Sequence, residues 1–222
     1  LELVTIKGAA ALGIDDLAIV LAKPVAVGST KSYFAMSGSG SAALIGVDSV
    51  AIAGRVAISI NKGKDGAANA AAIDFAASAT ANPDAWGGSE GLKVATGSAA
   101  DQFVVVEFAD SNLLKVAGYV TVSVAEFLHL SGQFAFSQSG TPQTVKVAGG
   151  ATKQVNVMTI GARDINAFVG IGGPYFVDRD SDGVIDANPQ AEGAMGFVLR
   201  NVEFALALFK PTNVAADHSS YY

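Results

Sequence analysis

Apolar side chains recur at every second residue along most of this chain. In the segment 120–124 valine alternates with threonine and serine, and comparable alternation runs through 17–21, 56–60 and 204–208. Successive side chains of a β-strand point to opposite faces, so this period is typical of half-buried strands and not of helices. The pattern therefore predicts an all-β, predominantly antiparallel fold.

Proline and glycine mark where these strands should end. The six prolines fall between the alternating segments, where a residue without a backbone N–H interrupts no hydrogen-bonded ladder. The 25 glycines are spread through the chain, which argues against long helices. The loops expected from these signals cover 24–31, 62–68, 79–91, 110–112, 139–143 and 171–194.

The second face of many predicted strands carries alanine, serine or glycine. A freely solvated face usually carries long polar side chains, so small residues there indicate that another layer covers this face closely. We therefore expect two stacked sheets or a closed structure, that is, an elongated sandwich-like or solenoid-like unit. A compositional bias toward alanine is the simpler alternative.

The segment 178–186 has the residue spacing of a calcium-binding loop. Carboxylates occupy its first, third, fifth and ninth positions, and Gly183 at the sixth permits a sharp bend. Calcium prefers oxygen ligands, and without a cation four carboxylates this close would repel one another. The predicted ligands are the side chains of Asp178, Asp180, Asp182, Asp186 and Asn188 and the backbone carbonyl of Val184, with Gln190 and Glu192 as alternative closing ligands.

This spacing differs from that of an EF-hand. The EF-hand loop ends with glutamate at its twelfth position, which here is Pro189, and helical periodicity is missing on both sides. The spacing instead resembles the short calcium repeats of thrombospondin type 3 and dockerin modules. A solvated acidic turn is the alternative interpretation. We expect 171–194 to form a calcium-binding loop inserted into a single all-β unit that covers 1–222.

Composition restricts the partners of the chain. It has 222 residues, 50% of them hydrophobic and 15% charged, with a net charge of −6 and a pI of about 4.8. An acidic chain is a poor partner for nucleic acid or anionic membranes. No apolar run is long enough for a membrane-spanning helix, so we expect no membrane insertion. Cysteine is absent, which excludes disulfides and thiolate metal sites.

The chain also resembles itself. Lys23-Pro24 follows the apolar run 17–21, and Lys210-Pro211 follows the run 204–208 in the same way. After each Lys-Pro pair comes a short loop and then two aromatic residues, Tyr33-Phe34 or Tyr221-Tyr222. Supersecondary units that recur in this way are typical of a tandem array, so we expect one period of about 187 residues plus an overlap, taken from something longer.

A second self-match relates two segments in the first two thirds of the chain. Residues 40–62 align without gaps on residues 118–140, which places Gly54 on Gly132. A third, shorter match relates 160–168 to 198–204. Three matches together strengthen the prediction of a repeat protein.

The order of these segments resembles the long repeats of very large bacterial extracellular proteins, including adhesin-like and calcium-dependent surface proteins. The resemblance covers most of the chain, through stretches such as 92–97, 116–138 and 164–170. It implies an exported protein, extracellular or at the cell surface, with a structural or adhesive role. Its partners would be neighbouring copies of the same repeat and, for an adhesin, surface glycans.

Two other functions compete with this interpretation. A lectin-like β-sandwich would use Trp86, or Tyr33 and Tyr175, to stack on sugars, although a hydrophobic lid over the sheet is the more ordinary role for Trp86. A hydrolase would use Ser89 in Gly87–Gly91, which satisfies G-x-S-x-G but lacks the strand before it and the helix after it. We expect a protein that is not an enzyme.

Overall fold

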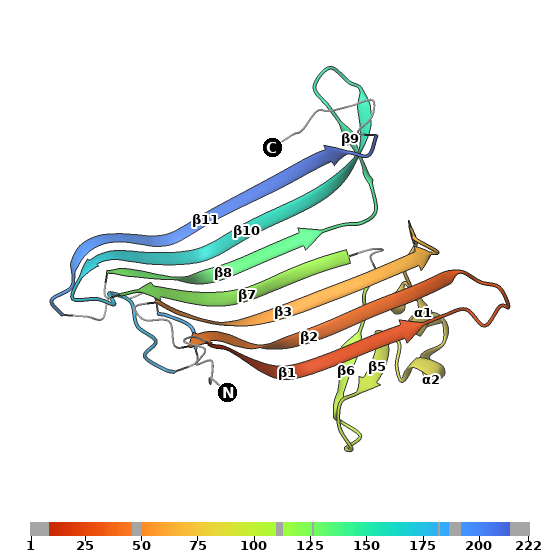
Figure 1. The fold of residues 1–222 in the computed structure, drawn as a ribbon, viewed down its shortest axis with the longest axis horizontal. Helices are drawn as coiled ribbons and strands as arrows, with labels where there is room; N and C mark the ends of the chain where they lie inside the picture. The colour runs from red at the N-terminus through yellow and green to blue at the C-terminus, as the bar shows by residue number, and fades with distance from the viewer. Residues whose placement is uncertain are drawn as a thin grey trace, which may run out of the picture.

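The computed structural model describes residues 9–45, 50–109, 113–125, 127–181, 183–186 and 192–213. Strands dominate these residues, as the alternating pattern predicts, and two short helices lie between β4 and β5 (Figure 1). The elements are β1 (Ala9–Ala22), β2 (Lys31–Ile45), β3 (Val50–Asp65), β4 (Ala68–Ala70), α1 (Phe75–Ala81), α2 (Pro83–Trp86), β5 (Leu92–Ala95), β6 (Phe103–Val106), β7 (Leu113–Val124), β8 (Leu128–Gln138), β9 (Gln143–Lys146), β10 (Thr152–Ile171) and β11 (Met195–Pro211).

Nine of these strands form one large sheet. Its main path has the order β1-β2-β3-β7-β8-β10-β11, while β4 pairs with β3 and β9 pairs with β10. Each pairing is antiparallel, so neighbouring strands in this path run in opposite directions. The predicted all-β, antiparallel fold class is confirmed. Among the described residues β1 and β11 form the two outer edges of the main path (Figure 1).

The two faces of the sheet differ in chemistry. Residues directly opposite each other in an antiparallel pair share a face, which traces each face across the strands. One face, here called the apolar face, carries large hydrophobic side chains on all seven strands of the main path. Examples are Ile19, Met36, Ile58, Val122, Leu130, Ile160 and Leu206. The opposite face, here called the loop face, carries mainly small and polar side chains such as Ala57, Ala117 and Ala135.

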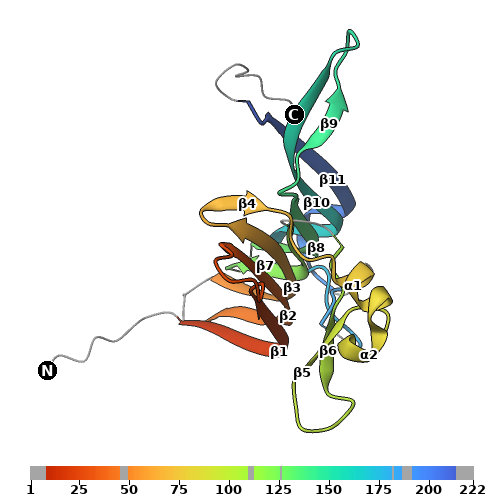
Figure 2. The same cartoon turned by 90° about the vertical axis from the view of Figure 1, so that its right-hand side faces the viewer.

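A small cap covers one end of the loop face at β1 and β2 (Figure 2). The cap consists of α1, α2 and the two-stranded sheet β5-β6. Its core buries Phe75 and Val106 against Ala18 of β1 and Ala35 of β2, both small enough to let the layers approach. The buried side chain of Asn61 on β3 donates a hydrogen bond to the carbonyl of Ile73, at 2.8 Å, and so ties the cap to the sheet.

Helix α1 is absent from the sequence prediction, which expects strands and loops in this region. Asp74 is its N-cap, and the Asp74 carboxylate accepts a hydrogen bond of 2.8 Å from the backbone N–H of Ala77. The segment 76–81 is rich in alanine, which favours helix, and the Asn82-Pro83 pair ends the helix. These helix signals are present in the sequence, but the alternating segments around them predict strands more strongly.

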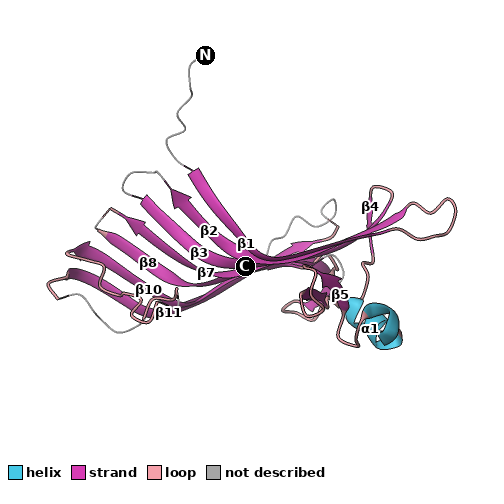
Figure 3. Ribbon diagram, turned by 90° about the horizontal axis from the view of Figure 1, so that it is seen from below, coloured by secondary structure: helices cyan, strands magenta, loops and turns pink. Residues whose placement is uncertain are grey.

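The expected second layer is only partly present. The cap and the segment between β10 and β11 cover parts of the loop face (Figure 3). On the apolar face, none of the large side chains that the structure describes is fully buried. No helix within the described residues is long and apolar enough to cross a membrane.

Candidate metal centre

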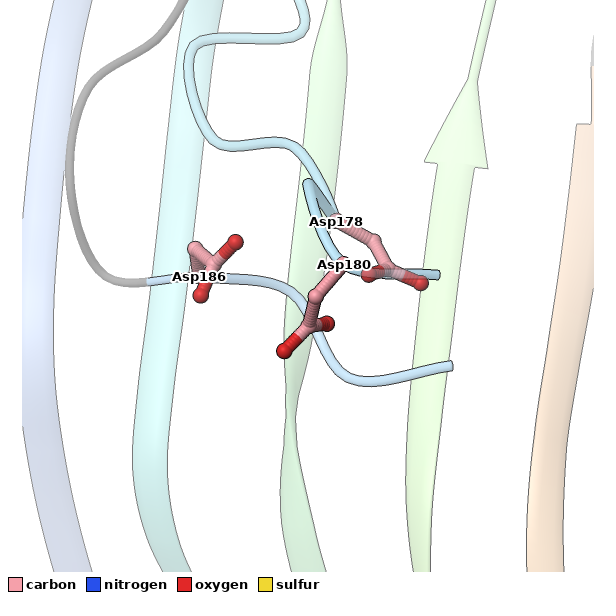
Figure 4. Close-up of side chains that lie close together, drawn as sticks. All are labelled: Asp178, Asp180 and Asp186. Atoms are coloured by element: carbon pink, nitrogen blue, oxygen red, sulfur yellow. The ribbon is translucent and has the colours of Figure 1, made fainter. Parts of the chain in front are cut away.

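The predicted calcium loop crosses the loop face between the end of β10 and the start of β11. Figure 4 shows its described part passing over β10, β8 and β7. The backbone N–H of Ile185 donates a 2.7 Å hydrogen bond to the hydroxyl of Tyr119 on β7. The side chains of Phe176, Val177 and Ile185 line a pocket of about 440 Å³ together with residues of β7, β8 and β10. The loop is therefore held against the sheet.

An aromatic stack anchors the first part of the loop. Phe168 of β10 is buried between the rings of His129 and Tyr175, with ring centroids 6.2 and 5.9 Å away. Tyr175 in turn contacts Phe176 edge to face at 5.1 Å. The guanidinium of Arg200 on β11 lies 5.6 Å from the Tyr175 ring and donates a hydrogen bond of 3.1 Å to its hydroxyl. These contacts fix the backbone directly before the acidic segment.

Three of the predicted ligands converge. Carboxylate oxygens of Asp178, Asp180 and Asp186 all lie within 4.8 Å of one another (Figure 4). Backbone donors orient two of the carboxylates: Gly183 N–H donates to Asp178 Oδ2 at 2.9 Å, and Arg179 N–H donates to Asp186 Oδ2 at 3.0 Å. Gly183 has a φ of +86°, which supports its predicted role in the bend.

The remaining predicted ligands have different outcomes. Asp182 and Asn188 lie outside the described residues, as does the alternative closing ligand Gln190. Val184 lies within the described loop with its side chain 43% exposed, and a carbonyl ligand at this position stays a prediction. Glu192 is exposed in the turn that precedes β11.

The chemistry of this cluster suits a hard cation. Asp178 Oδ1 is buried and has no hydrogen-bond partner among the described residues, so it is available as a ligand atom. Carboxylate oxygens are preferred ligands of calcium, and carboxylates this close repel one another unless a cation or protons intervene. Sequence reasoning missed the residues that hold the loop, Tyr119, His129, Phe168 and Arg200. They come from four different strands, and no local spacing links them to the acidic segment.

The alternative sites have little support in their geometry. Trp86 is half-buried and packs edge to face on Phe75 at 5.7 Å, so it acts as part of the cap core. Ser89 is exposed between helix α2 and strand β5, which reverses the strand-to-helix order that a nucleophile elbow requires.

No family model, curated protein or solved structure matches this chain.

Proposed function

We propose that this chain is a non-enzymatic structural module of a repetitive extracellular bacterial protein, and that calcium rigidifies it. Neighbouring copies of the same module would be its main partners. The observation that carries this proposal is the apolar face of the large sheet.

The apolar face is too large and too exposed for a chain that acts alone. Its edge strands leave Leu21 78%, Met195 65% and Phe197 64% exposed, and many large side chains of its central strands are only half-buried. Monomeric soluble proteins rarely expose contiguous apolar patches of more than a few hundred Å², and larger patches mark interaction surfaces. Burial of this face against neighbouring modules would remove it from water and so stabilise the array.

The self-matches of the sequence coincide with matching structure. The alignment of 40–62 on 118–140 places the β2–β3 hairpin on the β7–β8 hairpin. Gly40 lies opposite Val56 in the first hairpin, and the aligned Gly118 lies opposite Phe134 in the second. An identical register at aligned positions supports duplication of a supersecondary unit, the process that builds tandem arrays.

Calcium would act on the loop between β10 and β11. Apart from their contacts with the sheet, the described residues between Gly172 and Ala194 have almost no regular structure of their own. A cation held by Asp178, Asp180 and Asp186 would link the two ends of its acidic segment across the loop face. A ligand that binds only the ordered form stabilises that form by mass action. Extracellular modules bind calcium with a Kd of about 10⁻⁴ to 10⁻³ M, so extracellular calcium suffices for such a site.

The test is negative-stain electron microscopy and sedimentation velocity of the chain, in millimolar calcium and in EGTA. We expect extended, end-to-end assemblies that are straighter and more persistent in calcium. Isolated compact particles in both buffers would refute the array.

A variant pair separates the apolar face from general surface effects. Phe197→Lys should abolish assembly, because it places a charge on the apolar face at a position that is 64% exposed in one chain. Thr159→Lys introduces the same charge at an exposed position on the loop face and should assemble like the wild type. Equal assembly of the two variants would show that the apolar face is not the contact surface.

A further inference from the structure

The edge strand β11 repeats the edge strand β1 in sequence and in structure. The self-match that contains the two Lys-Pro pairs aligns Leu17 with Phe204, Ala18 with Ala205 and Leu21 with Leu208. Five strands separate β1 from β11 in an all-antiparallel order, so the two strands run in the same direction (Figure 1). The free edge of β11 therefore corresponds to the edge of β1 that binds β2.

The aligned residues also point to the same faces. Leu17 and Leu21 lie on the apolar face, and so do the aligned Phe204 and Leu208. Ala18 and Ala205 both lie on the loop face. A shift of the alignment by one residue would place every side chain of one strand on the opposite face from its match. The agreement in faces therefore tests the alignment independently of residue identity.

The two strands share a local irregularity as well. The register of β1 against β2 shifts between Ile14 and Asp16. The register of β11 against β10 shifts on both sides of Val202, which the same alignment matches with Asp15. Bulges of this kind bend a strand, so both strands are irregular near the matching position, β1 in its ladder with β2 and β11 in its ladder with β10.

The exposed alanine of β11 that matches Ala18 is small enough to lie beneath a cap. Ala18 is 1% exposed because the cap packs on it, whereas Ala205 is exposed. Both residues are alanine, and a side chain of this size leaves room for contact with Phe75 and Val106 of a cap. Across from Leu17, Gly38 of β2 has no side chain, and Leu17 packs over it, since a Cβ built on Gly38 would lie only 3.2 Å from Leu17 Cδ1.

We infer that β11 is the first strand of the next module, and that its free edge pairs with a β2 strand of a second copy of this module. The inference rests on the proposed array and specifies how its units join. The register follows from the pairing of β1 with β2: Ala205 lies opposite Ser37, and Ala207 lies opposite Ala35, of the next copy. The cap of that copy covers Ala205. One strand then belongs to two modules, and the sheet continues through the junction.

The experiment extends the full chain by its own sequence. Residues 35–109 are fused after Tyr222, which aligns with Phe34 in the match of the two aromatic pairs. Trp86 of the first copy is replaced by phenylalanine, so that fluorescence reports the appended cap alone. We expect the appended Trp86 to emit from a half-buried site, as in the cap of the first copy. Emission like that of the unfolded chain would overturn the inference.

Cysteine pairs test the register, because the chain contains no cysteine of its own. Ala205→Cys combined with Ser37→Cys in the appended segment should form a disulfide under mild oxidation, because directly opposite residues have close Cβ atoms. Ala207→Cys with the same partner is the matched control, on the same face but two residues out of register. A disulfide that forms equally well or better in the control would overturn the register.

A charge on β11 tests the covered face. Ala205→Lys should leave the chain alone folded, since Ala205 is exposed there, and should expose the appended Trp86. Leu206→Lys places the same charge on the apolar face and should leave the appended cap folded. A folded appended cap in the Ala205→Lys variant would refute the inference. The same fusion also shows whether calcium protects the loop from cleavage at Arg179. This measurement tests the proposed metal site and does not depend on the junction.

Discussion

Replacing Asp178 by asparagine should have effects of opposite sign in calcium and in a chelator. Asparagine keeps the shape of aspartate, and its side-chain oxygen can still accept the hydrogen bond from Gly183 N–H. The substitution removes one of three carboxylates whose oxygens lie within 4.8 Å of one another. In a chelator the variant is relieved of repulsion, while in calcium it loses a charged ligand.

The magnitudes follow from the geometry. Two unit charges about 4.8 Å apart repel by about 1 kcal/mol in a water-like dielectric, so the loss of two such pairs stabilises the closed loop by about 2 kcal/mol in chelator. In calcium at about 100 times the Kd, binding contributes about 2.7 kcal/mol to the wild type. Removing one charged ligand should eliminate most of that contribution, more than the about 2 kcal/mol gained from the relief of repulsion, so the variant is the less stable form in calcium.

Trypsin cleavage after Arg179 measures both effects, since Arg179 is exposed within the loop. When cleavage requires loop opening, its rate follows the population of the open form. We expect calcium to slow cleavage of the wild type by about 100-fold, and of Asp178→Asn by about threefold or less. In EGTA the variant should be cut more slowly than the wild type. Asp101→Asn, in the exposed turn between β5 and β6, is the control of equal charge change.

The expected reversal distinguishes a metal ligand from a structural aspartate. If Asp178→Asn is cut faster than the wild type in EGTA and by the same factor in calcium, the carboxylate serves only the fold of the loop. Magnesium at the same concentration should protect poorly, because it requires shorter and more regular coordination than calcium.

Three further substitutions test the contacts that hold the cap and the loop. Phe75→Ala should destabilise the cap by about 3–5 kcal/mol, because a fully buried ring is lost. The Trp fluorescence should shift to the red, and unchanged fluorescence would contradict the assigned cap core. Asn61→Ala leaves the carbonyl of Ile73 without its donor and should destabilise the attachment of the cap to the sheet by about 1–3 kcal/mol. Amide exchange in α1 should become faster, and unaltered exchange there would contradict the role of this bond. Tyr119→Phe removes the acceptor of Ile185 N–H and should speed trypsin cleavage of the loop by roughly tenfold, with the cap unaffected. A cleavage rate equal to that of the wild type would refute this anchor.

The strands were predictable because their signal is local. Alternation in 17–21, 56–60, 120–124 and 204–208 reports the two faces of each strand without knowledge of its neighbours, and each of these segments lies within a strand. The spacing of aspartates in 178–186 was equally local, and three of them do converge. Helix α1 was missed because a short alanine-rich segment with an N-cap is a weak signal beside long alternating segments.

The all-β class, the acidic loop and the likeness of β1 to β11 follow from the sequence alone, since each is a pattern along the chain. Three facts emerge only from the folded chain: which face stays uncovered, where the loop lies, and that β1 and β11 are opposite edges of one sheet. Those facts depend on register between distant segments, such as Tyr119 with Ile185 or Asn61 with Ile73. Register is fixed by packing of whole strands against their neighbours, and periodicity within one strand does not contain it.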